Sequence, residues 1–388
     1  MPDVLPIIII GTGLAGYSLA REFRKLDQNT PLLMLSRDDA HSYSKPMLST
    51  GFTKKKDANA LSMADPGKMA AQLKVSIRNF TDVTHIEADQ NQIRIGDETL
   101  GYSKLVLASG AKVNTLDFPG SDHPDVISIN DLMDYRAFRQ KLTTGKKNIL
   151  IMGAGLIGCE YANDLLNDGY QVTIVDPSES ALNGLIPDFA GKALIQGLEE
   201  AGAEFHMQDY VSEVHGQKDG LHVRLNNGRE LKCDLIISAV GLKPDIALAR
   251  EAGIHCNRGI TTNAYLQTNQ DNIYALGDCA EVEGRVRLYV LPLMASARAL
   301  AKTLHGQKTE VIFGIMPVAT KTPACPVITC PPITTPDKTI AGEWKIEQDG
   351  INIMAKFVDT HQHLRGFVLT GDKIKAKQNL LKELAPQP

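Results

Sequence analysis

The sequence predicts an α/β protein in three parts, two built on parallel sheets and one small α+β domain at the C-terminal end. Residues 8–16 and 150–158 read almost identically, and each runs from buried-strand residues through G-x-G-x-x-G into a helical pattern. Around them, strand-like and helix-like segments alternate, which is typical of parallel sheets covered by helices on both faces. The last part instead has short strand-like runs and a lysine-rich terminal helix.

Each glycine of these two fingerprints has its own role. The first allows a tight turn from strand to helix, and the second lets the backbone approach a pyrophosphate. The third lets helix and strand pack closely, so that the phosphates lie at the positive end of the helix. One such motif is also typical of a plain glycine-rich turn. Two in one chain, each between a strand and a helix, predict two dinucleotide-binding (Rossmann-like) domains.

The composition narrows the function classes. With 388 residues, two or three domains are expected, and 43% apolar and 22% charged residues are typical of a soluble globular protein. A net charge of −4 argues against nucleic-acid binding. No apolar run approaches the ~20 residues of a membrane span, and a strand so near the first residue argues against a signal peptide. The six cysteines are scattered, which predicts neither a metal site nor a disulfide framework and favours the cytoplasm.

The elements of the two large units follow from this alternation. In the first unit we expect strands at 5–10, 32–35 and 105–108 and a helix at 14–26. A stretch with proline and aspartate, 117–125, marks a boundary. In the second unit we expect helices at 131–142, 156–168 and 189–201 and strands at 148–152, 171–175 and 235–240.

The chain then returns to the first unit and ends in the third. A strand ending in Gly-Asp is expected at 273–278 and a helix at 294–304, and the small domain has strands at 344–346, 351–358 and 364–369. The predicted division is therefore residues 1–115 with 244–315, residues 116–243, and residues 316–388.

The residue that ends the second strand differs between the two units. In the second unit this strand ends at Asp176, 23 positions after Gly153, where a carboxylate accepts hydrogen bonds from a ribose 2′-hydroxyl and repels a 2′-phosphate. A solvated aspartate at a strand end is the alternative. In the first unit the strand ends Met34-Leu35-Ser36-Arg37, so the usual acid is missing and the Ser36 hydroxyl is the candidate. Asp176 therefore predicts a preference for NADH over NADPH.

Four landmarks in order resemble the flavoprotein reductases with two dinucleotide folds, of glutathione-reductase-like architecture. They are the first fingerprint, the turn Ala108-Ser109-Gly110, the second fingerprint with its following glutamate, and Tyr274-Ala275-Leu276-Gly277-Asp278. The resemblance implies tightly bound, non-covalent FAD in the first unit and a nicotinamide dinucleotide in the second. It also implies that Asp278 hydrogen-bonds the flavin ribitol, whereas a helix cap is the alternative.

Residues 42–49 resemble a segment of the ferredoxin- and rubredoxin-type reductases that passes under the flavin. The resemblance implies that Lys45 approaches flavin N5, paired with Glu160, although a surface lysine is the alternative. Residues 288–294 and 316–323 are similar to rubredoxin reductases, a resemblance that covers nearly the whole chain. It implies flavin contacts for Val290 and Lys321 and an adenosine contact for Val83.

The candidate site residues form two sets. Lys45 and Glu160 are the candidates at the reacting flavin, and neither is expected to transfer a proton. The candidates for FAD are Gly11, Thr12, Gly13, Leu14, Ala15, Gly16, Ser36, Arg37, Lys45, Val83, Asp278, Val290 and Lys321. The candidates for the nicotinamide dinucleotide are Gly153, Gly155, Gly158, Glu160 and Asp176.

The segment at 42–49 has serines and no cysteine where disulfide-reducing members of the family carry a redox dithiol. Electrons are therefore expected to pass from NADH to FAD and directly to rubredoxin, and the resemblance implies that rubredoxin supplies an alkane hydroxylase. The alternatives are reduction of a ferredoxin, a flavorubredoxin or a quinone, and a redox-sensing module without turnover. For a quinone reductase, residues 374–382 are the candidate membrane-anchoring helix, with a simple surface helix as the other interpretation. Lys54–Lys56 and the lysines at 373, 375 and 377 are candidate docking patches, with solvated surface lysines as the alternative. Cys325 and Cys330 are interpreted as an incidental pair.

Overall fold

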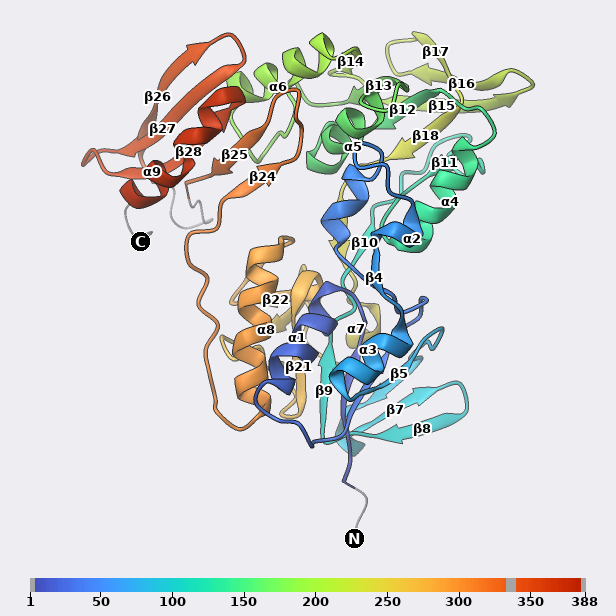
Figure 1. The fold of residues 1–388 in the computed structure, drawn as a ribbon, viewed down its shortest axis with the longest axis vertical. Helices are drawn as coiled ribbons and strands as arrows, with labels where there is room; N and C mark the ends of the chain where they lie inside the picture. The colour runs from blue at the N-terminus through green and yellow to red at the C-terminus, as the bar shows by residue number, and fades with distance from the viewer. Residues whose placement is uncertain (1–3, 333–339, 385–388) are drawn as a thin grey trace.

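The computed structural model describes residues 4–332 and 340–384. It has two lobes, with the N-terminal residues in one and the C-terminal sheet beside the other (Figure 1). Each lobe is built around a five-stranded parallel sheet, which confirms the predicted α/β fold class. Within the described residues, no helix is both long and apolar enough to cross a membrane.

The sheet of the first lobe gathers strands from both ends of the predicted first unit. The strand β1 lies in the middle, and its residues Ile8 and Ile9 are fully buried, as expected of a strand covered on both faces. The order is β21 (Ile273–Ala275), β9 (Lys104–Leu107), β1 (Ile7–Ile10), β2 (Leu32–Leu35) and β5 (Ser76–Arg78). The helices of this lobe are α1 (Leu14–Arg24), which packs against α8 (Val290–Leu304), and α3 (Pro66–Leu73) and α7 (Ala247–Glu251).

The second lobe repeats this plan. Its order is β11 (Val126–Ile127), β18 (Leu235–Ser238), β12 (Asn148–Met152), β13 (Gln171–Asp176) and β14 (Ala203–Met207). Its helices are α4 (Leu132–Leu142), α5 (Leu156–Leu166) and α6 (Asp188–Glu200). The strands β2 and β12 have the bounds that the sequence predicts, because each is an apolar run between clear breaks.

Each lobe also carries a three-stranded antiparallel sheet that the sequence analysis did not predict. They are β6 (His85–Glu87), β7 (Gln92–Ile95) and β8 (Glu98–Gly101) in the first lobe, and β15 (Val211–Gln217), β16 (Gly220–Leu225) and β17 (Glu230–Cys233) in the second. A smaller sheet of β20 (Ile260–Thr262), β22 (Ala280–Val282) and β23 (Arg285–Val286) lies near η3 (Gly277–Cys279).

The chain crosses between the lobes in paired strands. The strand β10 (Ala111–Val113) pairs antiparallel with β19 (Leu242–Pro244), close to the predicted boundaries. A second segment of the chain leaves the first lobe through β3 (Ser42–Tyr43) and returns through β4 (Ser62–Ala64), which pairs with β3. Between them, η1 (Lys45–Thr50) and α2 (Ala58–Leu61) pack into the core of the second lobe, where Figure 1 shows α2 beside α4. The predicted division of the chain stays a prediction.

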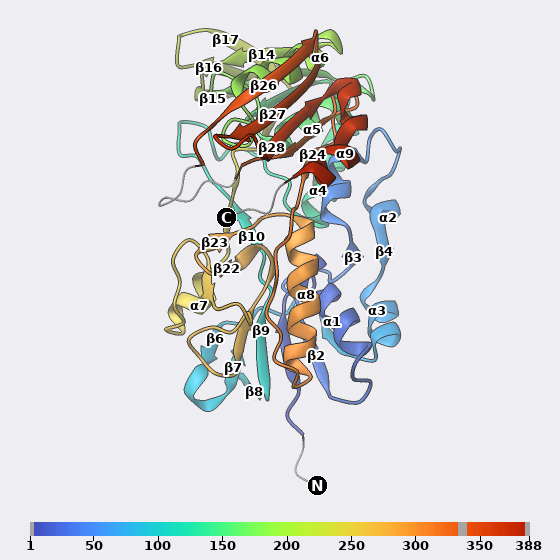
Figure 2. The same ribbon diagram turned by 90° about the vertical axis from the view of Figure 1, so that its left-hand side faces the viewer.

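The C-terminal domain is a five-stranded antiparallel sheet that packs against α6 of the second lobe (Figure 2). Its order is β24 (Val318–Thr320), β25 (Val327–Cys330), β28 (Leu364–Thr370), β27 (Asn352–Asp359) and β26 (Gly342–Asp349). It ends in η4 (Gly371–Ala376) and α9 (Lys377–Glu383). The helix predicted at 294–304 begins earlier, at Val290, because Pro292 stands in its first turn, where a missing N–H costs nothing.

Candidate functional site

The turns of the two fingerprints have nearly the same geometry. Gly11 and Gly153 take φ values of +115° and +109°, which side-chain-bearing residues rarely adopt. A Cβ atom on Gly16 would lie 2.0 Å from the Gly11 carbonyl oxygen, and one on Gly158 would lie 1.9 Å from that of Gly153. These four glycines are therefore required by the fold itself, whatever the turns bind.

The middle glycines have a different surrounding. A Cβ atom on Gly13 or Gly155 would meet no heavy atom within 4 Å. Each of the two caps the helix that follows, α1 or α5, without a side-chain hydrogen bond. Open space in front of free N–H groups at a helix N-terminus suits a phosphate group, which both the amides and the helix dipole attract. Leu14 and Ala15, on the first turn of α1, complete this loop.

The carboxylate of Asp176 is fixed beside the second fingerprint. Its Oδ2 accepts a hydrogen bond from the Ala154 N–H at 2.7 Å, and its Oδ1 accepts one from the Ser178 N–H at 2.7 Å. The side chain stays half-buried at the end of β13. An oriented anion at this position suits a ribose and disfavours a 2′-phosphate.

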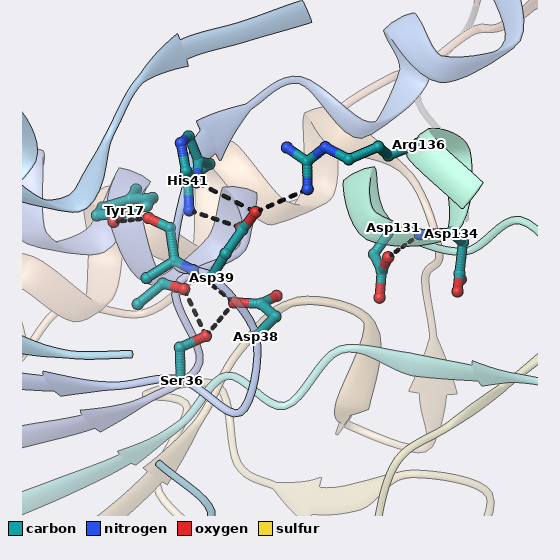
Figure 3. Close-up of polar contacts among 10 residues, drawn as sticks. Tyr17, Ser36, Asp38, Asp39, His41, Asp131, Asp134 and Arg136 are labelled. Atoms are coloured by element: carbon teal, nitrogen blue, oxygen red, sulfur yellow. Dashed lines mark hydrogen bonds and ion pairs between the residues drawn. The ribbon is translucent and has the colours of Figure 1, made fainter. Parts of the chain in front are cut away.

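In the first lobe, two hydroxyl groups connect the fingerprint loop to the nearest carboxylate. The Thr12 hydroxyl donates to Ser36 Oγ at 2.7 Å, and the Ser36 hydroxyl donates to Asp38 Oδ1 at 2.5 Å (Figure 3). The Ala40 N–H also donates to Asp38 Oδ1, at 2.9 Å. The carboxylate near this fingerprint is therefore Asp38, which the sequence analysis missed. Its signal was an aspartate two residues beyond the expected position.

The next two candidates for the FAD site are Arg37 and Val83. Arg37 is exposed, and its guanidinium donates to Asp245 Oδ2 at 3.1 Å, while Lys112 holds Asp245 Oδ1 at 2.8 Å. This ion pair ties the end of β2 to the residue that follows β19. Val83 is buried in the apolar core of the first lobe.

Lys45 and Asp278 influence one another electrostatically. Burial lowers the pKa of Lys45, and the carboxylates of Asp278, Asp131 and Asp134 oppose this shift. Burial likewise raises the pKa of Asp278, and Lys45 opposes that shift. The Lys45 ammonium donates to Asn130 Oδ1 at 2.7 Å. Lys45 thus projects among carboxylates at the boundary of the two lobes.

Asn130 is a second residue that the sequence analysis missed. Its Nδ2 donates to the Ala111 carbonyl oxygen at 2.9 Å, and its backbone N–H donates to Asp134 Oδ2 at 2.9 Å. The side chain therefore joins Lys45 to β10 and to the start of α4, where Asp131 is the N-cap. Figure 3 shows Asp131 and Asp134 across from Asp38.

The expected pairing of Lys45 with Glu160 differs from the arrangement in the structure. The Glu160 side chain is 0% exposed, and its Oε1 accepts the Lys321 N–H at 2.8 Å. The Lys321 ammonium forms an ion pair with Glu160 Oε2. Lys321 takes the place of Lys45 because its main chain and its side chain both reach the same carboxylate.

Val290 is the first residue of α8 and is half-exposed. The helix α8 contacts η3, which carries Asp278, so these two candidates lie on neighbouring elements. The candidates therefore form two groups. The first group comprises the first fingerprint with Lys45, Asp278 and Val290. The second group comprises the second fingerprint with Glu160 and Lys321.

The cysteine pair of the C-terminal domain is suited to packing. All six cysteines are free thiols. Burial raises the pKa of both Cys325 and Cys330 to about 11, so both stay protonated near neutral pH. A protonated, buried thiol is a poor redox relay.

Two family models cover nearly the whole chain. The model for pyridine nucleotide-disulphide oxidoreductases matches residues 5–302, and the model for rubredoxin-binding C-terminal domains matches residues 310–384.

Full-length relatives agree with these matches. The chain is 49% identical to a rubredoxin-NAD(+) reductase of Alcanivorax borkumensis, over 98% of both chains. It is 44% identical to a rubredoxin-NAD(+) reductase of Acinetobacter baylyi, again over 98% of both. A nitric oxide reductase FlRd-NAD(+) reductase of Aliivibrio fischeri is 37% identical over 98% of both.

Solved structures share the fold at lower identity. A ferredoxin reductase from Rhodopseudomonas palustris superposes with a TM-score of 0.86 at 23% identity, over 98% of this chain and 96% of that one. The covalent putidaredoxin reductase–putidaredoxin complex gives 0.87 at 21% identity, over 98% and 93%. These likenesses concern the fold alone.

Proposed function

Because the chain belongs to the pyridine nucleotide-disulphide oxidoreductase family and ends in a rubredoxin-binding domain, we propose that it carries electrons from NADH through FAD to rubredoxin. It is an oxidoreductase, with rubredoxin and NAD(+) as its partners. The observation that carries the proposal is the joining, in one chain, of two dinucleotide fingerprints to this C-terminal domain.

The residues of the first lobe fit FAD. The space in front of Gly13 would accommodate the pyrophosphate, and the free N–H groups of α1 would bind it. Asp38 and Ser36 would hold the adenosine ribose, while Lys45, Asp278, Val290 and Lys321 would surround the reactive half. Bound FAD supplies acceptance of a hydride and release of single electrons, which a one-electron iron protein needs.

The second lobe fits NADH. Asp176 would accept hydrogen bonds from the adenosine ribose, and Gly155 would leave room for the pyrophosphate. The two lobes would then orient donor and acceptor rings together, and holding reactants in place accounts for much of such catalysis. Glu160 and Lys321 would fix the polar surroundings of the flavin ring, and no proton transfer is assigned to either residue.

Two measurements test this proposal. The purified protein should show a flavin absorbance spectrum, and anaerobic NADH should bleach it within a single turnover. Added rubredoxin should then reoxidise it, faster than ferredoxin, flavorubredoxin or a quinone does. The higher identity to rubredoxin-NAD(+) reductases (49% and 44%) than to the FlRd-NAD(+) reductase (37%) supports the preference for rubredoxin over flavorubredoxin. A flavin that NADH bleaches but no protein acceptor reoxidises would favour a sensing role instead.

We also propose that the reduced rubredoxin supplies an alkane hydroxylase in the cytoplasm. The resemblance to rubredoxin reductases suggests this use, and the free cysteines agree with a reducing compartment. In a reconstituted mixture with a hydroxylase, NADH consumption and alcohol formation should both require rubredoxin and this protein. Alcohol formation that continues when rubredoxin is omitted would remove this part of the proposal.

A further inference from the structure

The helix α5 has an unusual buried face. Its residues Glu160, Asn163 and Asp164 are 0%, 1% and 2% exposed, although all three are polar. Buried polar groups are stable only when they are hydrogen-bonded, and buried charges need pairing as well. The partners of these three residues come from elsewhere in the chain. They therefore mark a place where α5 binds other segments.

Those segments come from the other two parts of the molecule. Asn163 Oδ1 accepts the Ala324 N–H of the C-terminal domain at 2.9 Å. Asp164 accepts the N–H groups of Phe52 and Thr53, just after η1, at 3.0 Å and 2.7 Å. The face of α5 thus joins the η1 segment to the rubredoxin-binding domain.

Ser49 completes this junction at Glu160. It is buried, and its hydroxyl donates to Glu160 Oε2 at 2.5 Å. The same hydroxyl lies 3.4 Å from the Pro46 carbonyl oxygen, and since it has one hydrogen, the shorter contact to a carboxylate prevails. The Lys321 ammonium in turn donates to Ser49 Oγ at 3.3 Å. Ser49 therefore bonds both members of the buried ion pair.

The backbone directs Ser49 toward this pair. The η1 helix is kinked at Ser49, where φ is −88° and ψ is 18°. Lys45, at the start of the same short helix, bonds Asn130 on the other side. One six-residue element therefore contacts both groups of candidate residues.

The Ser49 hydroxyl supplies an anchor that Lys321 alone does not. The side chain of Lys321 is 35% exposed, so water competes for its ammonium, whereas Ser49 is enclosed. We propose that Ser49 is a positioning residue for flavin reduction, and that its hydroxyl orients the Glu160 carboxylate, and through it Lys321, where the three parts of the molecule meet. This inference rests on the proposed role of Glu160 and Lys321 beside FAD.

The test is the reduction of bound flavin by NADH in stopped flow, with the flavin midpoint potential measured alongside. Ser49→Ala removes the hydrogen bond to the Glu160 carboxylate and the one from the Lys321 ammonium, and should slow reduction about tenfold or more. Its FAD content should stay unchanged, and the fall should appear in the limiting rate rather than in the NADH concentration dependence. Ser49→Thr keeps the hydroxyl and should restore most of the rate.

Thr50→Ala is the matched control. It removes a hydroxyl from the neighbouring residue of η1 that donates to the Met47 carbonyl oxygen at 3.1 Å and not to Glu160, and it should leave the rate unchanged. In a double-mutant cycle, Ser49→Ala should have little further effect once Glu160→Gln is present, because Ser49 acts through that carboxylate.

The outcomes separate the two claims. If Glu160→Gln leaves the reduction rate unaltered, the proposed role of Glu160 is wrong. If Glu160→Gln slows reduction while Ser49→Ala does not, or if Ser49→Ala adds its full effect to Glu160→Gln, the inference about Ser49 is wrong and the proposed function stands.

Discussion

The two dinucleotide units differ where their backbones are most alike. Both have a five-stranded parallel sheet and an antiparallel three-stranded sheet, and the turns at Gly11 and Gly153 differ by only a few degrees in φ. Asp176, the last residue of β13, bonds its fingerprint loop directly, whereas Asp38, three residues beyond β2, reaches Thr12 through Ser36. Glycines and buried strands therefore fix the backbone, while the polar end of the site is free to vary with its ligand.

The surroundings differ as well. The proposed FAD site is approached by Lys45 and Asp278 from separate segments, whereas Asp176 stands at a half-buried strand end. We interpret the first as suited to a resident cofactor and the second to a substrate that must leave after each turnover. The predictions below test this contrast.

The largest effect is expected where the two units agree. Gly16→Ala and Gly158→Ala each place a Cβ atom about 2 Å from a backbone carbonyl oxygen, which no side-chain motion relieves. Each should destabilise its lobe by about 3 kcal/mol or more. Thermal unfolding of the purified variants measures this. Near-normal stability of either variant would show that the two turns are not equivalent.

The middle glycines should separate the two units. Gly13→Val fills space where the proposed FAD pyrophosphate lies, so the protein should fold and purify without flavin. Gly155→Val should keep its flavin but need far more NADH to reduce it. Flavin absorbance and NADH titration measure the two outcomes. A fully flavinated Gly13→Val variant would contradict the assignment of the first site.

The two carboxylates should differ in which ligand they affect. Losing a hydrogen bond from a charged group costs roughly 1.5–3 kcal/mol, so Asp176→Ala should lower kcat/KM for NADH about ten- to a hundredfold. The ratio of kcat/KM for NADH to kcat/KM for NADPH should therefore fall. Asp38→Ala should weaken FAD retention and leave the NADH preference intact. Asp39→Asn is its control, because Asp39 pairs with His41 and Arg136 rather than with Ser36. Equal use of NADH and NADPH by the unaltered protein would contradict the role of Asp176.

The smallest effect is expected at the surface. If Lys54–Lys56 or the lysines of η4 and α9 attract an acidic rubredoxin, its reduction should slow with ionic strength, because exposed charges are screened beyond about 8 Å near physiological salt. Reduction of bound flavin by NADH should change far less. Charge-reversed lysine variants identify which patch acts. Equal salt responses of the two steps would remove the docking proposal.

Local patterns predicted those elements whose residues carry their own signal. The strands β2 and β12 are apolar runs with clear ends, and α4 begins after its N-cap Asp131, where the sequence predicts the start of a helix. The three-stranded antiparallel sheets of the two lobes were not predicted, because their short strands mix apolar and polar residues, as in β7 with its sequence QIRI. Their stability comes from pairing with neighbours, which a single segment does not reveal.

In the candidate site, too, the local features could be predicted from the sequence and the long-range contacts could not. Glycine positions follow from motif spacing, because the turn that needs them is local. The partner of Lys45 depends on how η1 packs near the start of α4, over a separation of 85 residues. The partner of Glu160 depends on how the C-terminal domain packs against α5, over 161 residues. Spacing in the sequence holds no information about such contacts. The sequence analysis therefore expected Lys45 beside Glu160, whereas in the structure Lys45 bonds Asn130 and Glu160 pairs with Lys321, and Ser49 went unnoticed.

The path of the chain into the C-terminal domain has a consequence for its docking. Residues 305–317 leave α8 in the first lobe and run back along that helix, yet the domain they lead to packs on α5 and α6 of the second lobe (Figures 1 and 2). The domain is thus covalently attached to one lobe and non-covalently held by the other. Its docking is an intramolecular reaction at a high effective concentration, set by a short tether. A domain released by mild denaturant should therefore return at a rate independent of protein concentration, so dilution does not separate it from the second lobe.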